Sequence, residues 1–293
     1  MRTPYPPVEL ANRVGRTVAD DGSFEQFDAV GRATCDALLS ALPEDWSWTG
    51  TRVLDFGCGV GRTLRHLVGV ADGAQLLGCD IDARSIAWVN ANLGGSVRGF
   101  TSHPWPPLTQ PDDSFDLVYA FSVFTHIGDA WSAWLTELHR VLKPSGLLVA
   151  SFLGAGVAES LTGEPWDEDR IGMNVLLAHQ GWERGGPTVL LSPWWLRAHW
   201  GRAFEIVDLQ DHERSGGQGL VVAAPRDVTP TPELLEAIDA GEPRELAALQ
   251  HQIRQLRRES ALLAQTVDEY EDSLSWRLTR PLRDLRGRLR PAP

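Results

Sequence analysis

The stretch VLDFGCGVGRTLRHL, residues 53–67, decides the fold of this chain. It begins with an apolar run typical of a buried strand, passes through glycines at 57, 59 and 61, and continues in a helical pattern. Many proteins bind a nucleotide-like cofactor with a strand, a glycine-rich turn and a helix, because glycine lets the backbone approach the ligand closely. The stretch therefore predicts a cofactor site.

The spacing of the glycines argues against a nicotinamide dehydrogenase. The dinucleotide fingerprint is G-x-G-x-x-G, and here Arg62 stands where its third glycine belongs. In that fingerprint the third glycine permits close helix packing, while the helix N-terminus takes the pyrophosphate. The G-x-G-x-G loop of this chain lacks the pyrophosphate arrangement and suits a cofactor with an amino-acid tail.

A second element supports a nucleoside-bearing cofactor. The next apolar run ends in GCDID at 78–82, which places Asp80 nineteen residues past Gly61. A carboxylate at a strand end can accept hydrogen bonds from both ribose hydroxyls, and Ile81 can lie against an adenine face. A glycine-rich loop alone is a weak signal, but with a strand-end Asp at this distance the signal is strong.

The chain around these motifs alternates short apolar runs with helical patterns, which is typical of parallel strands joined by crossover helices. We expect a doubly wound α/β fold with a seven-stranded, mostly parallel sheet. The expected strands are 52–56, 75–80, 97–100, 115–121, 146–152, 204–210 and 219–224, the last two forming an antiparallel hairpin. The expected helices are 28–42, 61–69, 83–92 and 130–142, and KPSG at 143–146 is expected to turn the chain into its fifth strand.

The 293 residues divide into several expected segments. These are an N-terminal helical cap (1–50), a cofactor-binding domain (51–225), a linker with a short helix (226–243), a coiled coil (244–276) and a basic amphipathic tail (277–293). Residues 153–193 interrupt the domain with an irregular insert that is too long for a simple connection. We expect this insert to cover the acceptor site.

The coiled coil is predicted from a heptad seam, in which apolar residues and one serine recur alternately three and four positions apart. Its members are Leu246, Leu249, Ile253, Leu256, Ser260, Leu263, Val267, Tyr270 and Leu274. Charged residues such as Arg254, Glu259 and Glu269 occupy several of the other positions. The pattern predicts self-association, and the alternative is a long helix that folds back onto its own domain.

Composition limits the partners and the location. The net charge of −12 argues against nucleic acid as the main partner, because binding phosphates needs a basic surface. The chain has neither a transmembrane-length apolar run nor a signal peptide, so we expect a cytoplasmic protein. The three cysteines, Cys35, Cys58 and Cys79, lack metal-binding spacing; we expect reduced core thiols and no metal site.

Four stretches together resemble the class I S-adenosylmethionine-dependent methyltransferases. They are VLDFGCGVGRTLRHL (53–67), LLGCDIDARSIAWVNANL (76–93), PDDSFDLVYAFSVFTHI (111–127) and WLTELHRVLKPSGLLVASF (134–152). The resemblance covers residues 51–152 densely and extends by strand pattern to about 225. It implies a Rossmann-like fold, S-adenosyl-L-methionine as the cofactor, and methyl transfer as the activity.

The resemblance also implies roles for individual residues. It assigns the methionine portion to Asp55, Gly57 and Gly59 in the loop that Gly61 completes, the ribose to Asp80 and the adenine to Ile81. Ala120, Phe121 and Ser122 are placed beside the sulfonium. The family often has an Asp after the third strand for the adenine amino group. This chain has GFTSHPWPPL there, which leaves Thr101, Ser102 or the backbone for that contact.

His126 is the candidate general base, because it follows the fourth strand where the acceptor should arrive and its imidazole titrates near neutral pH. The alternative is that His126 caps or packs against the following helix. The tryptophans in loops and in the insert, among them Trp105, Trp166 and Trp182, either stack on a sugar or aromatic acceptor or pack the loops. On the helix at 130–142, Trp131 and Trp134 are expected to face the core.

The C-terminal tail carries a second resemblance. SLSWRLTRPLRDLR at 273–286 is similar to a tail that recurs after coiled coils on bacterial glycosyltransferases and other enzymes of cell-surface polysaccharide assembly. Residues 273–293 hold six arginines and one acid, Asp284, so their net charge is +5. Such a tail could bind an anionic membrane surface or an acidic protein, or it could simply be solvated.

The sequence thus predicts a methyltransferase that acts on a hydroxyl of a sugar or glycan in cell-surface polysaccharide biosynthesis, in the cytoplasm or at the inner face of the membrane. Two alternatives stay open. One is a small-molecule methyltransferase of secondary metabolism. The other is a non-catalytic coiled-coil scaffold with a relic domain, against which the intact glycines and Asp80 argue.

Overall fold

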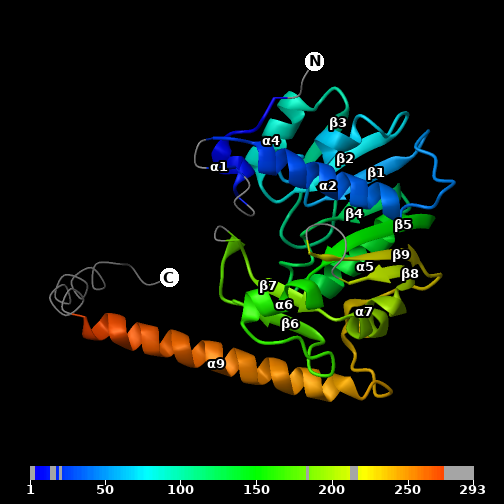
Figure 1. Cartoon of the computed structure of the whole chain (residues 1–293). Coiled ribbons are helices and arrows are strands. Elements are labelled where there is room, and N and C mark those ends of the chain that lie inside the picture. Colours follow the sequence, from blue (N-terminus) through cyan, green and yellow to red (C-terminus); the bar gives the residue numbers. More distant parts are fainter. Residues whose placement is uncertain (1–3, 14–17, 20–21, 183–184, 212–216, 274–293) are drawn as a thin grey trace, which may run out of the picture.

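The computed structural model of the chain describes residues 4–13, 18–19, 22–182, 185–211 and 217–273 (Figure 1). Within these residues seven strands form the central sheet, in the order β3-β2-β1-β4-β5-β9-β8. Their bounds are β1 Arg52–Phe56, β2 Gln75–Asp80, β3 Val97–Thr101, β4 Phe115–Ala120, β5 Leu142–Phe152, β8 Phe204–Gln210 and β9 Gly219–Pro225. The first five strands are parallel, and β9 is antiparallel to both β5 and β8. The predicted seven-stranded, mostly parallel α/β sheet is confirmed.

The strand bounds agree with the expected ones to within a residue except in β5, which begins at Leu142 instead of 146. The pairing with β4 shifts register between Phe115–Leu142 and Leu117–Leu147, so β5 carries extra residues within the strand. The KPSG segment lies in this irregular part and is not a turn ahead of the strand. A turn-like composition can also mark a bulge, because a bulged residue leaves the hydrogen-bonded ladder.

Helices cover both faces of the sheet. One face packs against α2 (Glu25–Ala41), α3 (Leu64–Leu67) and α4 (Ala83–Asn92), which contribute Leu38, Leu67 and Val89 to a common core. The helix expected at 61–69 is only the single turn α3, whereas α4 has the expected bounds. The Asp82 side chain caps α4 by accepting hydrogen bonds from the Arg84 and Ser85 amides.

The opposite face packs against α5 (Trp131–Val141), α7 (Pro193–His199) with the 3-10 turn η2 (Trp200–Arg202), and α8 (Pro232–Glu236). Trp131 and Trp134 are buried there, as expected for the core face of α5. A Leu or Trp at every third or fourth position gives α5 one apolar side, which it buries against the sheet.

The insert is more regular than expected. It contains α6 (Ala155–Thr162) and a separate two-stranded antiparallel sheet of β6 (Met173–Leu176) and β7 (Thr188–Leu191). A bridge between Leu153 and Leu190 joins β7 to the end of β5. The Val189 amide also donates to the Thr125 carbonyl at 2.8 Å, so β7 is tied to the loop that follows β4.

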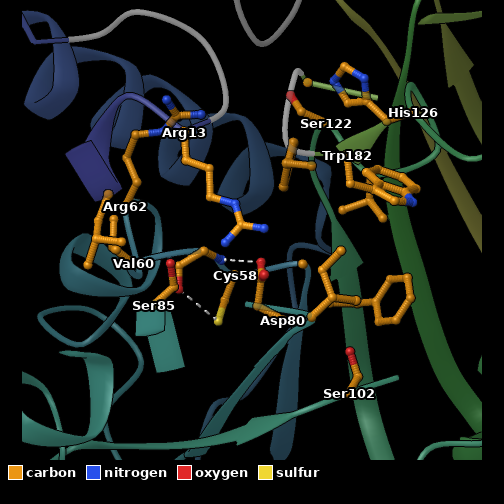
Figure 2. Close-up of a pocket in the computed structure, with 18 of the residues that line it drawn as sticks. Arg13, Cys58, Val60, Arg62, Asp80, Ser85, Ser102, Ser122, His126 and Trp182 are labelled. Atoms are coloured by element: carbon orange, nitrogen blue, oxygen red, sulfur yellow. Dashed lines mark hydrogen bonds between the residues drawn. The ribbon is translucent and has the colours of Figure 1, made fainter. Parts of the chain in front are cut away.

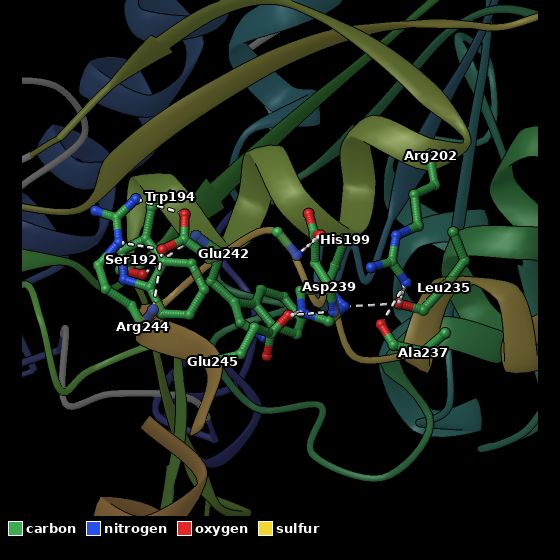
Figure 3. A network of polar contacts seen from close by, with 12 residues as sticks. Ser192, Trp194, His199, Arg202, Leu235, Ala237, Asp239, Glu242, Arg244 and Glu245 are labelled. Carbon is green, nitrogen blue, oxygen red and sulfur yellow. Dashed lines mark hydrogen bonds and ion pairs between the residues drawn. The ribbon is translucent and has the colours of Figure 1, made fainter. Parts of the chain in front are cut away.

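The last described element is α9 (Arg244–Asp272), a single long helix that runs past the insert (Figure 1). Its start is anchored by a buried polar contact, in which His199 Nε2 lies 2.9 Å from Glu245 Oε1 (Figure 3). Glu245 Oε1 also accepts a hydrogen bond from the Asp239 amide at 3.1 Å. Burial lowers the pKa of His199, an effect opposed by its contacts with the Leu235 carbonyl and Glu245.

Among the residues described, α9 has no partner helix, so the coiled coil stays a prediction. Its last expected residues and the basic tail at 277–293 lie outside the described part of the chain. No helix in the described ranges is long and apolar enough to cross a membrane.

Candidate functional site

A cavity of about 180 Å³ lies at the carboxyl ends of β1, β2 and β4 (Figure 2). This is where the strand order reverses between β1 and β4, the position at which doubly wound sheets bind ligands. The glycine loop, the ends of β2 and β4, the N-terminal helix α1 (Val8–Ala11) and the insert all contribute to its lining. The cavity therefore brings the separate sequence motifs together.

The glycine loop needs its glycines for different reasons. Gly57 has φ +81°, and a Cβ there would lie 2.4 Å from Val123 Cγ2, so a side chain is excluded by both strain and space. Gly59 has φ +51°, and a Cβ there would meet nothing within 4 Å. Gly59 therefore keeps the cavity open. A Cβ on Gly61, in contrast, would collide with the side chain of Leu93, which packs beneath the loop.

Asp80 joins the glycine loop to the end of β2. Its Oδ2 accepts the Gly59 amide at 2.8 Å, and its Oδ1 accepts the Asp82 amide at 2.8 Å. Each carboxylate oxygen retains a lone pair for a further donor, such as a hydroxyl. Burial raises the pKa of Asp80, and the two backbone donors oppose that rise. Ile81 and Ser102 line the same cavity, and the Ser102 amide donates to the Asp80 carbonyl at 3.0 Å.

Three of the expected cofactor residues do not line the cavity, namely Asp55, Gly61 and Ala120. Ala120 is fully buried, and Asp55 is 5% exposed behind the glycine loop. Burial raises the pKa of Asp55 to about 8, with the Tyr119 hydroxyl lowering it and Asp80 raising it further. These three residues therefore lie behind the wall of the cavity.

Phe121 and Ser122 line the cavity at the end of β4. Ser122 has φ +56°, and its amide donates to Ser151 Oγ at 2.7 Å. Ser151 Oγ in turn donates to Gln218 Oε1 at 2.7 Å, and Gln218 Nε2 donates to Ser122 Oγ at 2.9 Å. This polar network fixes the turn after β4. The sequence analysis missed Ser151 and Gln218, because Ser151 lies in β5, Gln218 lies just before β9, and no local pattern links either of them to Ser122.

His126 lines the cavity and is held by the insert. Its Nδ1 lies 2.8 Å from the Pro187 carbonyl, which can only accept, so Nδ1 carries the proton and Nε2 of the neutral ring carries the lone pair. Burial lowers the pKa of His126, and the contact with Pro187 opposes this effect. No side chain caps α5, so His126 does not have the alternative helix-capping role. A neutral imidazole with a free Nε2 is suited to accepting a proton.

Several lining residues were not assigned to the site from the sequence. Arg13 of the N-terminal segment forms an ion pair with Asp82, and Arg62 is a largely buried guanidinium whose pKa burial lowers. Figure 2 shows these two arginines on one side of the cavity and His126 and Trp182 on the other. Trp182 comes from the insert, as does Gly185. The insert therefore reaches the cavity, although it covers only part of it.

The other loop tryptophans lie elsewhere. Trp194 and Trp195 of α7 are buried in the hydrophobic core. Trp105 is exposed and does not line the cavity. Trp166 donates to Glu168 Oε2 at 2.7 Å near α9. Trp182 is thus the member of this set that could contact a molecule entering the cavity.

Comparison with known proteins matches the part of the chain that builds the cavity. Residues 54–150 match the family model described as methyltransferase domain. The ubiquinone biosynthesis O-methyltransferase of Bradyrhizobium sp. is 35% identical over 151 residues, covering 50% of this chain and 53% of that protein. The enzyme of the same name from Cereibacter sphaeroides is 31% identical over 140 residues, covering 46% and 54%. The chain spans about half the length of these relatives.

Further matches carry other names. The sterol 24-C-methyltransferase of Gibberella zeae is 32% identical over 126 residues, covering 41% of this chain and 30% of that protein. Among solved structures, the PH0226 protein of Pyrococcus horikoshii superposes with a TM-score of 0.51 at 20% identity, covering 73% and 97%. A glycopeptide N-methyltransferase in complex with S-adenosylmethionine superposes with a TM-score of 0.50 at 15% identity, covering 67% and 94%. Residues 54–150 therefore match a methyltransferase domain, and the fold is shared with these two solved structures.

Proposed function

We propose that this chain, built around a methyltransferase domain, is an S-adenosylmethionine-dependent methyltransferase whose cavity at the β1–β2–β4 edge holds the cofactor. The observation that carries the proposal is the Asp80 carboxylate, held by the Gly59 amide and lining the cavity beside the open face of that glycine. Asp80 would bind the ribose hydroxyls, Ile81 and Ser102 would contact the adenine, and Gly57 and Gly59 would take the amino-acid portion. Asp55, Gly61 and Ala120 would support this site from behind.

When bound, S-adenosylmethionine supplies an electrophilic methyl group on a sulfonium. We propose that the acceptor is a hydroxyl, because His126 presents a free Nε2 to the cavity. His126 Nε2 would take the proton of the acceptor hydroxyl while the oxygen receives the methyl group that the cofactor supplies. The insert fixes the tautomer and position of His126 through Pro187, and Phe121 and Ser122 shape the wall beside the reacting atoms.

The proposed acceptor is a sugar or glycan hydroxyl. Two observations support it: Trp182 of the insert lines the cavity with an exposed ring on which a sugar face can stack, and the tail resembles those of polysaccharide enzymes. Polysaccharide assembly would place the enzyme at the inner face of the membrane, with the basic tail as its contact. A small aromatic alcohol of secondary metabolism is the second candidate. The apolar lining, and the ubiquinone O-methyltransferases among the relatives, favour that alternative.

The first experiment is calorimetric titration of the purified chain with S-adenosylhomocysteine and separately with NAD. We expect micromolar binding of S-adenosylhomocysteine, no binding of NAD, and a loss of about 100-fold or more in the Asp80→Ala variant, because hydrogen bonds to a charged group are worth ~1.5–3 kcal/mol each. Asp113→Asn is the control, since Asp113 is exposed and its φ of +50° suits Asn. Failure of the intact chain to bind S-adenosylhomocysteine would favour the scaffold alternative.

Transfer of a labelled methyl group from S-adenosylmethionine to two acceptor panels then separates the candidates. Sugars and short glycans form one panel, and small phenols and quinols form the other. With a sugar acceptor, we expect the Trp182→Ala variant to raise KM about fivefold while kcat changes less, because one stacking contact is worth about 1 kcal/mol. Labelling confined to the phenols would overturn the glycan assignment and leave the methyltransferase assignment standing.

A further inference from the structure

The helix α9 docks on its own chain through a polar stripe, which consists of Glu245, Ala248, Gln252, Gln255 and Glu259. Gln252 Oε1 accepts the Val175 amide at 3.0 Å, and Gln252 Nε2 donates to the Val175 carbonyl at 3.1 Å. Further along, Glu259 Oε1 accepts the Leu177 amide at 3.1 Å. These residues recur three and four positions apart, so they form one continuous face of the helix.

The heptad seam lies on a different face, one residue further along the chain than the polar stripe and so rotated from it by about 100° around the helix axis at 3.6 residues per turn. Its apolar members between Leu246 and Tyr270 are 39% to 65% exposed. The chain therefore holds α9 in place without using the apolar residues that the heptad pattern singles out. The sequence left open that the long helix folds back onto its own domain. This contact uses the polar stripe and leaves the seam without a partner among the described residues.

The exposed seam is large for a monomer. At these exposed fractions it offers on the order of 700 Å² per chain, more than the ~300–600 Å² of the largest apolar patch on a typical monomer. It approaches the ~800 Å² per partner that a stable protein–protein interface buries. The area therefore matches what a two-chain interface needs.

We propose that the seam binds the same seam of a second copy of this chain, in a parallel two-stranded coiled coil. Numbering the heptad from Leu246 as position a places Ile253 and Val267 at a, and three of the four d positions are leucine. β-branched residues at a with leucine at d favour parallel dimers. Two flanking side chains, Gln252 and Glu259, stay bound to β6 and to Leu177, and Thr266 lies opposite Glu271 of the second copy, so no flanking pair opposes like charges.

The oligomeric state of the full chain tests the proposal, measured by analytical ultracentrifugation at micromolar concentrations. We expect the intact chain to sediment as a dimer and Leu263→Asp, a d-position variant, to sediment as a monomer. Leu262→Asp is the matched control, because Leu262 is 64% exposed on the same helix turn but lies off the seam. A monomeric intact chain, including one whose own residues 274–293 cover the seam, would overturn the proposal, as would equal behaviour of the two variants.

Oxidative cross-linking tests the parallel order. The three native cysteines are buried, so an introduced thiol reports on its own position. In a parallel dimer the a-position residues of the two copies face each other, so Ser260→Cys should form a disulfide-linked dimer and Gln265→Cys, on the outer face, should not. A dimer that fails to cross-link at 260, or that cross-links equally at 265, would overturn the parallel arrangement. Titration with S-adenosylhomocysteine tests the methyltransferase proposal independently of both outcomes.

Discussion

The cofactor edge of the sheet and the contact between α9 and the insert satisfy their polar groups in different ways. At the cofactor edge, Asp80 is bound by backbone amides of Gly59 and Asp82, which lie within about twenty residues of it in the sequence. At the α9 contact, side chains such as Gln252 bind backbone groups of β6 that lie 77 residues away. The first region is built from a local motif, and the second depends on how distant segments meet. The comparison suggests that the two regions should respond to mutation independently, except at residues that join them.

His126 is such a joining residue, because it lines the cavity while the insert holds its ring through Pro187. We expect His126→Ala to lower kcat by about 10²–10⁴-fold, as for loss of a general base, with little change in the affinity for S-adenosylhomocysteine. His103→Ala is the control, since His103 is exposed and lies outside the cavity. Steady-state kinetics and calorimetry separate the two quantities. An unchanged kcat would leave His126 a purely structural link.

The same residue sets a pH dependence. Burial lowers the pKa of His126 below its ordinary value of 6.5, so the ring is neutral and able to accept a proton at pH 7. We therefore expect kcat/KM, which reports the groups of the free enzyme, to be constant above pH 6.5 and to fall only as the pH drops through the lowered pKa. The free energy of unfolding also decreases as the pH drops below 6.5. The reason is that the unfolded chain then binds a proton at His126 that the folded chain does not bind. An acid limb of the kcat/KM profile above pH 6.5 would contradict the assignment.

Within the cofactor edge, two glycines separate stability from binding. We expect Gly57→Ala to lower the free energy of unfolding by about 3 kcal/mol, because the added methyl combines a positive φ with a collision against Val123. For Gly59→Ala we expect a loss of only about 1 kcal/mol, since its Cβ enters open space, together with weaker binding of S-adenosylhomocysteine. Urea denaturation and calorimetry measure the two effects. Equal stability losses would mean that the loop relaxes around Val123.

Within the α9 contact, the smallest effect is expected from Gln252→Ala. The variant loses two hydrogen bonds to Val175 in a partly exposed place, so we expect about 1 kcal/mol of destabilisation. Hydrogen exchange should become faster at residues 173–177 and remain unchanged in the glycine loop. Gln265→Ala, which affects only an exposed contact with Glu269, is the control. Faster exchange in both regions would show that they are coupled after all.

The difference between the regions also explains what the sequence could predict. The strands, α4, the glycine loop and Asp80 carry local signals, since each depends on alternation, capping or spacing within about twenty residues. The early start of β5 escaped prediction because a change of pairing register leaves no local pattern. Ser151 and Gln218 escaped for the same reason, as their partner Ser122 lies 29 and 96 residues away. The polar stripe on α9 was hidden because its residues resemble an ordinary solvated face.

The heptad seam shows the limit of a pattern that is recognised correctly. Its spacing predicted a long helix, and α9 is one, but spacing alone did not tell which face of the helix would meet the chain's own domain. Hydrogen-bonding capacity decided this, since the free backbone of β6 needs polar partners and leucines cannot supply them.

The pairing of Gln252 with Val175 has a consequence for solubility. A two-stranded sheet normally leaves edges with unpaired amides and carbonyls, which recruit strands from other chains and lead to aggregation. Here β7 is joined to the rest of the domain through Leu153 and Thr125. The other edge, on β6, is covered by the side-chain amide of Gln252, which bonds to Val175 as a neighbouring strand would. The covered edge of β6 therefore disfavours open-ended strand stacking between copies, and the proposed pairing of α9 helices would be closed and two-fold.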